Sequence, residues 1–294
     1  MKVGFIGLGR MGSTMADRIL GGGHEIAVYN RTESKCVDVV SRGAKLAQTV
    51  AEAAGFGDVV ITMLENDAAL SGIALDDDGL IQSMPRGGIH LAMGTHSVAM
   101  IGKLTEAHAK ADQVLLCAPV MGRPPVAAAG QLGILTGGPA AAVDKCRPLF
   151  AVMGRRTFDC GPTPVGAAAA KIANNAVLAC AVEAMGEGFA LAEKCGVSAS
   201  AFLDILTDGL FAAPAYKIYG KLIAEKGYFG EPGFTATTGL KDVNLALAAG
   251  ETAGVPLPSA NVCRDRLVGA IARGNGECDW SVMADEQARA SSIA

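Results

Sequence analysis

A glycine-rich turn directly after a short apolar run constrains this chain more than any other feature. The run VGFI covers residues 3–6, and GLGRMG follows at residues 7–12 before helical spacing begins. In such a strand–turn–helix unit the first glycine permits the tight turn, the second lets backbone approach a pyrophosphate, and the third lets the helix pack on the strand. The helix N-terminus adds N–H donors and the positive end of a dipole. We therefore expect this turn to bind a dinucleotide through Gly7, Leu8, Gly9, Arg10, Met11 and Gly12.

Short apolar runs alternate with helical stretches in the first half of the chain. The β-like runs fall at residues 3–6, 25–30, 58–63, 87–93 and 113–120, with two further short runs at 132–138 and 156–161. Stretches with helical spacing, such as Met11–Leu20 and Met100–Ala111, separate them. This alternation predicts βαβ units and a mainly parallel sheet. We assign residues 1–162 to an NAD(P)-binding Rossmann domain of the α/β class.

The pattern changes after Pro164. Residues 165–195 contain no proline, are dominated by Ala, Leu, Met and Glu, and end before Gly196, a suitable C-cap. This predicts a helix of roughly 30 residues, about 45 Å long. Helical patterns also fill the rest of the chain, so we assign residues 163–294 to an all-α C-terminal domain that the long helix joins to the first.

Composition argues against several classes of protein. Hydrophobic residues make up 50% of the 294 residues and charged residues 18%, which suits a packed core and not disorder. The net charge of −4 includes no block of like charges, so we expect no nucleic-acid partner. The apolar N-terminal run leads straight into the glycine turn, which favours a strand over a signal peptide. Only the Ala-rich stretch at 165–195 is a candidate membrane span, and we expect Lys171 and the asparagines after it to interrupt it.

The cysteine and histidine patterns favour a cytoplasmic protein without a bound metal. None of the eight cysteines forms a C-x-x-C pair, and most stand among apolar residues. Reduced, buried thiols are the expected state. The four histidines show no ligand spacing with cysteines or carboxylates, so no metal site is expected.

The end of the second β-like run bears on the choice of cofactor. NAD-specific proteins place an acid about 20 residues past the glycines, to bind the ribose hydroxyls. Asn30 occupies that place, and Arg31 and Thr32 follow it. A guanidinium can pair with a 2′-phosphate and stack on adenine. We expect NADP; the alternative is that Arg31 is an ordinary exposed charge and the enzyme uses NAD, which Glu33 would tolerate weakly.

Several further motifs occur in the order typical of one family. They are FIGLGRMGSTMA at 5–16, NRT at 30–32, TMLENDAAL at 62–70, APVMG at 118–122, GQLGILTGG at 130–138, KIANN at 171–175 and GLKDVNLAL at 239–247. Together they resemble the β-hydroxyacid dehydrogenase family, which includes 3-hydroxyisobutyrate dehydrogenases and glyoxylate/succinic semialdehyde reductases. The resemblance implies a Rossmann domain, a long helix, an all-α domain and a homodimer or homotetramer.

The resemblance also implies roles for residues outside the glycine turn. Met63, Leu64 and Thr95 correspond to cofactor contacts near the ribose and nicotinamide. Lys171 corresponds to the catalytic lysine and Asn175 to its partner. Lys241 corresponds to a second lysine near the nicotinamide, with Asp242 beside it. The implied activity is hydride transfer between a nicotinamide and a β-hydroxy acid or semialdehyde-type carbonyl.

Lys171 also stands out from its own surroundings. It is the only charged residue between Asp159 and Glu183, within VGAAAAKIANNAVLACAV. A lysine there is costly unless its ammonium is paired or faces a cleft. Asn175 lies one helical turn on and Asn174 three residues on, so both are near it. Hydride transfer to a carbonyl leaves an alkoxide that needs a proton, which a lysine with a lowered pKa can donate near neutral pH.

Two alternatives remain at these lysines. Lys171 could extend its ammonium to water from an exposed helix end. Lys241 and Asp242 could form a solvated ion pair; if Lys241 instead lies near Lys171, like-charge repulsion would lower the pKa of Lys171.

The expected substrate loop departs from the family pattern. A Ser-Gly pair usually follows Pro-Val there, but this chain has Met121 and Gly122 before Arg123. Methionine removes a donor and adds an apolar, adaptable wall. Backbone donors of Gly122 and Arg123 can still hold a carboxylate. We expect a substrate site formed by Met121, Gly122, Arg123, Lys171, Asn174 and Asn175, accepting a bulkier or more apolar aldehyde or hydroxy acid.

Other functions on the same architecture remain open. Imine reductases share it but usually carry Asp or Tyr where this chain has Lys171. A non-catalytic dinucleotide-binding assembly module would have lost that lysine. The chain is too short for the larger helical domain of 6-phosphogluconate dehydrogenase.

Overall fold

The computed structural model describes residues 1–293, which form two compact units. The first unit spans Met1–Lys171 and the second begins at Ile172, within one continuous helix. The domain boundary expected at residues 162 and 163 stays a prediction. Each unit has its own core and its own architecture.

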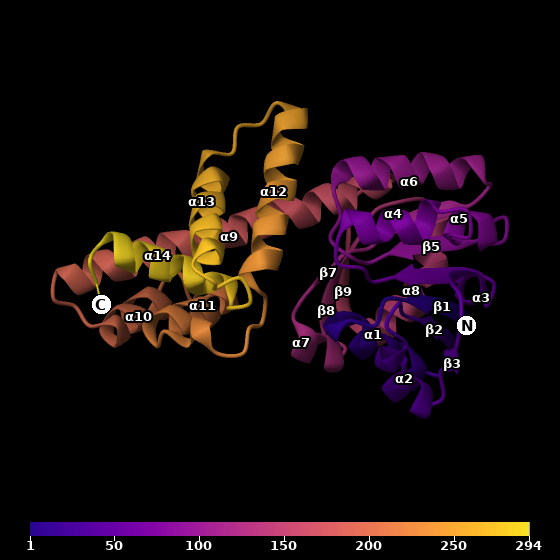
Figure 1. Cartoon of the computed structure of the whole chain (residues 1–294), viewed down its shortest axis with the longest axis horizontal. Helices are drawn as coiled ribbons and strands as arrows, with labels where there is room; N and C mark the ends of the chain where they lie inside the picture. The colour runs from indigo at the N-terminus through magenta and orange to yellow at the C-terminus, as the bar shows by residue number, and fades with distance from the viewer. Residues whose placement is uncertain (294) are drawn as a thin grey trace. The chain divides into compact units, whose positions relative to one another are not determined.

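A six-stranded parallel sheet forms the centre of the first unit (Figure 1). Its spatial order is β3-β2-β1-β4-β5-β6, the order of the doubly wound dinucleotide-binding fold. The strands are β1 (Lys2–Ile6), β2 (Glu25–Tyr29), β3 (Lys45–Leu46), β4 (Val59–Thr62), β5 (Ile89–Ala92) and β6 (Val114–Cys117). All four residues of β4 and of β5 are buried, as expected for parallel strands covered on both faces. The expected Rossmann architecture is confirmed.

The strand register brings the expected cofactor segments to one edge of the sheet. Ile6 pairs with Tyr29 and with Thr62, and Thr62 pairs with Ala92. The residues that follow these strands therefore leave the sheet side by side. This edge, at the carboxyl ends of parallel strands, is where open α/β sheets bind ligands.

Helices cover both faces of this sheet. On one face, side chains of α1 (Arg10–Gly21) and α8 (Ala140–Met153) join a core with Val3 and Phe5. On the other face, α3 (Val50–Ala54), α4 (Asp67–Leu75), α5 (Leu80–Ser83) and α6 (Val98–Lys110) pack against Ile6 and Val60. Figure 1 shows α4, α5 and α6 together on one side of the strands and α1 on the other. Short α2 (Val37–Ser41) follows the 3₁₀ turn η1 (Glu33–Cys36).

A small second sheet follows the parallel one. It consists of β7 (Val120–Met121), β8 (Leu132–Thr136) and β9 (Gly154–Asp159) in the order β7-β8-β9. The strands expected at residues 132–138 and 156–161 are thus confirmed. Short α7 (Pro124–Ala128) follows β7, so the segment expected to bind substrate lies at a strand-to-helix junction.

The second unit is entirely helical over the residues that the structure describes. Helix α9 (Pro164–Lys194) has 31 residues, and Gly196 follows with φ of +86°, the left-handed conformation common beyond helix ends. The other elements are α10 (Ala199–Asp208), α11 (Pro214–Ala224), η2 (Gly227–Phe229), α12 (Ala236–Ala253), α13 (Pro258–Ala272), η3 (Trp280–Val282) and α14 (Met283–Ala290). Fully buried Trp280 packs edge-on against Tyr219 and Phe234 in the core.

The expectation that Lys171 and the asparagines interrupt a membrane span does not hold on length and composition. Helix α9 contains an 18-residue window with a mean hydropathy of 1.5, of which 33% is buried within the chain. A window of this length and hydropathy remains a candidate membrane span even when it contains one or two charged residues. Core helices of soluble proteins do so as well, so the helix gives only weak evidence for a membrane.

Candidate functional site

Each of the three glycines in the turn after β1 has a different structural environment at the place where a side chain would begin. Gly7 has φ of +101°, and a Cβ on it would lie 2.4 Å from the carbonyl oxygen of Met63. A Cβ on Gly12 would lie 1.9 Å from the carbonyl oxygen of Gly7. A Cβ on Gly9, by contrast, would meet no atom within 4 Å. Gly7 and Gly12 are therefore required by the fold, whereas the space beside Gly9 is open, as a pyrophosphate cradle requires.

The N-terminus of α1 is suited to an anion. Its N-cap is Gly9, which has no side chain to satisfy the first N–H groups, and its first turn contains no acidic residue. The N–H groups of a helix's first turn and the helix dipole both favour a negatively charged ligand there. Arg10 begins the helix with an exposed side chain, followed by half-buried Met11.

Asn30 connects the glycine turn to the segment after β2. Its Oδ1 accepts a hydrogen bond from the backbone N–H of Leu8 at 2.9 Å, and its Nδ2 donates to the carbonyl oxygen of Thr32 at 2.9 Å. The side chain thus positions backbone on both sides, leaving Arg31 and Thr32 exposed. No carboxylate occupies the end of β2.

The loops after β4 and β5 complete this edge of the first unit. Met63 and Leu64 are half-buried and lie against the glycine turn, since the Cβ position of Gly7 is 2.9 Å from a methyl carbon of Leu64. Thr95 lies in the loop between β5 and α6 and is also half-buried. The expected cofactor residues of the first unit therefore gather at one edge.

The segment that departs from the family pattern lies at the end of β7. Met121 is half-buried, and its terminal methyl lies 3.0 Å from the Cβ position of Gly133 in β8. Gly122 has φ of +143°, a conformation that favours glycine. Half-buried Arg123 is the N-cap of α7. Part of the Met121 side chain is thus used in packing on the small sheet.

A buried polar network joins α9 to α12 in the second unit. Asp242 is 2% exposed, and its Oδ2 accepts a hydrogen bond from Nδ2 of Asn175 at 2.6 Å. Its Oδ1 lies 2.9 Å from Nζ of Lys241. Asn174 donates from Nδ2 to Oδ1 of Asn175 at 3.4 Å. Lys241 and Asp242 are therefore not a solvated pair, because the carboxylate is buried and bonded to both neighbours.

Lys171 lies on α9 one turn before Asn175, and its side chain is half-buried. The two residues therefore share one helical face, as their spacing predicts. The structure thus gathers the expected cofactor residues of the first unit at the edge of the parallel sheet, whereas Met121, Gly122 and Arg123 lie at and directly after the end of β7 of the small sheet. It joins Asn174, Asn175 and Lys241 to Asp242 in one network of the second unit. Their catalytic and binding roles remain predictions.

Three residues with polar contacts near these segments were not among the expected site residues: Asp242, and Asp67 and His96, whose side chains lie 3.3 Å apart between the loops after β4 and β5. Asp242 had a visible signal, its position beside Lys241 at the start of a helix. Asp67 and His96 had none, because their pairing depends on two loops that the sheet brings together.

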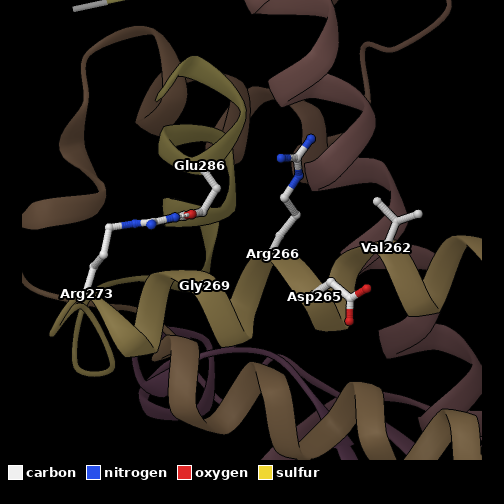
Figure 2. A pocket seen from close by; sticks show the side chains of 6 residues that line it. All are labelled: Val262, Asp265, Arg266, Gly269, Arg273 and Glu286. Atoms are coloured by element: carbon white, nitrogen blue, oxygen red, sulfur yellow. Dashed lines mark hydrogen bonds and ion pairs between the residues drawn. The ribbon is translucent and has the colours of Figure 1, made fainter. Parts of the chain in front are cut away.

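The second unit contains a hollow of about 350 Å³, and two arginines that line it form ion pairs (Figure 2). It is lined by Val262, Asp265, Arg266, Gly269, Arg273 and Glu286. Nε of Arg266 donates to Glu183 at 2.8 Å, and Nε of Arg273 donates to Glu286 at 2.8 Å. Both guanidinium groups are thus bonded to buried carboxylates, so these pairs link helices and do not form an anion site.

The cysteines of residues 1–293 form no disulfide, and four of them are buried. All eight cysteines are unpaired, and burial raises the pKa of Cys117 and of Cys146 to about 12, so these two are protonated at neutral pH. No group of three His, Cys, Asp or Glu side chains in this range is arranged to hold a metal ion.

Comparisons with known proteins agree with this architecture. Residues 2–161 match the family model described as the NAD binding domain of 6-phosphogluconate dehydrogenase. Residues 166–286 match the one described as NAD-binding of NADP-dependent 3-hydroxyisobutyrate dehydrogenase. The chain therefore belongs to the β-hydroxyacid dehydrogenase family, whose members are NAD(P)-dependent oxidoreductases.

Individual relatives extend over nearly the whole chain. An uncharacterised oxidoreductase of Bacillus subtilis (strain 168) is 42% identical over 284 residues, covering 96% of this chain and 98% of that protein. Glyoxylate/succinic semialdehyde reductase 1 of Arabidopsis thaliana is 32% identical over 283 residues, covering 96% and 97%. The solved structure of Mycobacterium tuberculosis 3-hydroxyisobutyrate dehydrogenase with L-serine has a TM-score of 0.88 at 26% identity, covering 97% and 98%.

An imine reductase structure is also similar. That protein, from Pseudomonas sp., has a TM-score of 0.63 at 23% identity, covering 96% of this chain and 97% of that one. At this identity the similarity concerns the fold alone. The architecture is thus shared by carbonyl and imine reductases, as expected from the sequence.

Proposed function

We propose that this protein is an NADP(H)-dependent oxidoreductase that interconverts a β-hydroxy acid and a semialdehyde-type carbonyl. The observation that carries the proposal is the contact of buried Asn175 and Asp242 with partly exposed Lys241, in which Asn175 lies one helical turn from Lys171. Asn175 and Asp242 are both buried, and burying polar groups costs free energy unless they are hydrogen-bonded, as these two are to each other.

In this proposal the nicotinamide supplies or accepts the hydride. Lys171 gives a proton to the carbonyl oxygen as it becomes an alkoxide, and takes it back in the direction of alcohol oxidation. Asn175 donates from Nδ2 to Asp242, so its Oδ1 is the atom that can accept a hydrogen bond from a substrate hydroxyl, with its second lone pair beside the long bond from Asn174. Oδ1 of Asp242 lies 2.9 Å from Nζ of Lys241 and offsets its positive charge, and we assign Lys241 a contact with the cofactor.

The proposed preference for NADP depends on the end of β2. Asn30 is already engaged with backbone on both sides, so it does not take the place of the ribose-binding acid of NAD enzymes. Exposed Arg31 and Thr32 supply a guanidinium and a hydroxyl for a 2′-phosphate. Replacing Arg31 with alanine should raise the Kd for NADPH while leaving the Kd for NADH unchanged.

The proposed substrates are bulkier or more apolar than hydroxyisobutyrate. Met121 provides no hydroxyl donor for a carboxylate, and its thioether can adapt to an apolar group. Initial rates with NADPH over glyoxylate, succinic semialdehyde and larger aldehydes test this. Faster turnover of the larger aldehydes is expected. Equal or faster turnover of glyoxylate and succinic semialdehyde would contradict the proposed substrate preference.

An imine substrate is the second candidate because of the shared fold and the absent serine at position 121. Including a cyclic imine in the same panel distinguishes the two. Lys171 favours the carbonyl, since imine reductases usually carry Asp or Tyr at that place. Oxidation of NADPH by the imine but by none of the carbonyls would contradict our proposal.

We further propose that the protein is a cytoplasmic homodimer or homotetramer. Apolar side chains of the second unit support association: Val177, Leu191 and Ile205 are 71%, 69% and 67% exposed. Light scattering on the purified protein measures its mass directly. A single species of one chain mass would contradict the oligomer.

A further inference from the structure

Asp67 connects the two loops at the cofactor edge. It is the first residue of α4, yet the cap of that helix is Asn66, whose Oδ1 accepts from the N–H of Ala69 at 2.9 Å. The carboxylate of Asp67 is therefore not needed as a cap. Its Oδ1 instead accepts from the backbone N–H of Ser97, in the loop after β5, at 3.0 Å.

His96 lies beside this contact, with a side chain that has no exposed surface. Its Nδ1 is 3.3 Å from Oδ1 of Asp67. On the far side of the ring, Nε2 of His96 and the carbonyl oxygen of Leu64 each lie 2.5 Å from the Cβ position of Gly94. The ring thus fills the space between the loop after β4 and the loop after β5, and position 94 must be glycine.

The carboxylate of Asp67 is ionised at neutral pH. Burial acts to raise its pKa, but the contact with His96 and the hydrogen bond from Ser97 outweigh burial and lower the pKa to about 2. An imidazole that faces a carboxylate presents its N–H to it, which fixes the ring orientation. Bonds to an ionised acceptor are stronger than neutral ones, so the contact can hold a loop.

We propose that His96 and Asp67 are positioning residues for the cofactor, which hold the loop after β4 against the loop after β5. The expected cofactor residues Leu64 and Thr95 stand in these two loops, directly beside the pair. Neither His96 nor Asp67 is assigned a contact with the cofactor. The inference rests on the proposed function, because it requires that these loops bind NADP(H).

The test measures the Kd for NADPH from nicotinamide fluorescence, with kcat at saturating NADPH as the second readout. Asp67→Asn and His96→Leu should each raise the Kd roughly tenfold, the scale of one bond to a charged group, and leave kcat within about twofold. The double variant should bind NADPH with the same Kd as the single variant of lower affinity, because both substitutions break the same contact. His96→Asn keeps an N–H donor near the place of Nδ1 and should restore most of the affinity.

Thr49→Ala is the matched control for a purely structural effect. Thr49 caps α3 in the same unit by accepting from the N–H of Glu52, so its loss lowers stability without touching either loop. It should leave the Kd for NADPH unchanged. An unchanged Kd in both Asp67→Asn and His96→Leu, additive losses in the double variant, or an equal loss in Thr49→Ala would overturn the inference. A wild-type protein that bound neither NADPH nor NADH would overturn the proposed function, and this inference with it.

Discussion

At the scale of single residues, the glycine turn separates what the fold needs from what a ligand needs. A Cβ on Gly7 or Gly12 would collide with a backbone oxygen, whereas a Cβ on Gly9 would meet no atom within 4 Å. All three are equally visible in the sequence, but only the structure shows that they differ. Their substitutions should therefore have different consequences.

Gly9→Ala should leave the fold intact and weaken cofactor binding. Its φ of −73° suits any residue, and the cost in stability should be at most about 1 kcal/mol. The added methyl occupies the space next to the helix N-terminus, so the Kd for NADPH should rise at least about tenfold, as each 1.4 kcal/mol of lost binding does. Gly12→Ala is the contrasting variant, which should lower the unfolding midpoint. Normal NADPH affinity in Gly9→Ala would contradict the cradle.

Asp242 is the residue on which the second network depends. Asp242→Asn keeps the shape but removes the charge that faces Lys241, and its amide can place a donor against Nδ2 of Asn175. We expect kcat to fall by at least about tenfold, as expected for a misplaced catalytic group. Steady-state rates and a thermal unfolding curve distinguish this from misfolding. Unchanged kcat in a folded variant would remove Asp242 and Asn175 from the proposed mechanism.

At the scale of elements, buried side chains connect helices to the sheet in the first unit. Gln113 donates from Nε2 to two backbone carbonyl groups at the end of α5, so its Oε1 accepts from Nδ1 of His108 at 2.8 Å. Nε2 of His108 then accepts from Nδ1 of His90 at 2.8 Å, and Nε2 of His90 accepts from the hydroxyl of Thr62 at 2.8 Å. The bonding thus requires both rings to be neutral.

This chain of bonds should make the first unit sensitive to acid. The pKa of His90 is well below 6.5 because of burial and the nearby His108 and His96, and burial also lowers the pKa of His108. The unfolded chain takes up protons below about pH 6.5 while the folded rings stay neutral, so stability is complete above that pH and is lost below it. Between pH 7.5 and 5.5, wild type should lose more stability than His108→Gln, by up to about 1.4 kcal/mol, the limit for one ring that takes up no proton in the folded state.

Urea unfolding followed by far-UV circular dichroism measures this difference. The comparison with His108→Gln is needed because burial raises the pKa of Glu183 in the second unit, which acts in the opposite direction. An equal loss in both proteins would show that the buried rings do not carry the pH dependence.

The ion pairs around the hollow should contribute to the stability of the second unit. Arg266→Ala leaves the Glu183 carboxylate, 5% exposed, without its charged partner, and should lower the free energy of unfolding by about 3–5 kcal/mol. Replacing both residues, as in Glu183→Leu with Arg266→Met, should cost less. Fluorescence of Trp280, the chain's only tryptophan, reports on this unit during unfolding. A double variant less stable than Arg266→Ala would contradict this account.

Secondary structure was predictable where apolar patterns are long or repeated. Five of the six strands of the parallel sheet and helix α9 were visible, because each repeats its pattern over several residues. The sequence pattern did not indicate α8, since Pro148 lies inside it, or β3, which has two residues. Proline argues against a helix interior on local grounds, and here packing of Leu149 and Phe150 against the sheet outweighs it.

At the scale of the whole molecule, the family motifs gave the order of the domains and the expected catalytic groups. They could not give the contacts made across long sequence separations. Asn175 bonds to Asp242, 67 residues on, and Asp67 bonds to a loop 30 residues on. Such partners depend on which helices and loops become neighbours, which a single sequence does not reveal.

The central claim is that Lys171 moves the proton that accompanies hydride transfer. The most direct measurement compares wild type with Lys171→Ala in NADPH oxidation by succinic semialdehyde, together with the Kd for NADPH. We predict that turnover falls by about two orders of magnitude or more, the usual contribution of a general acid, while the Kd stays within about twofold. Equal turnover in the two proteins would contradict the role of Lys171.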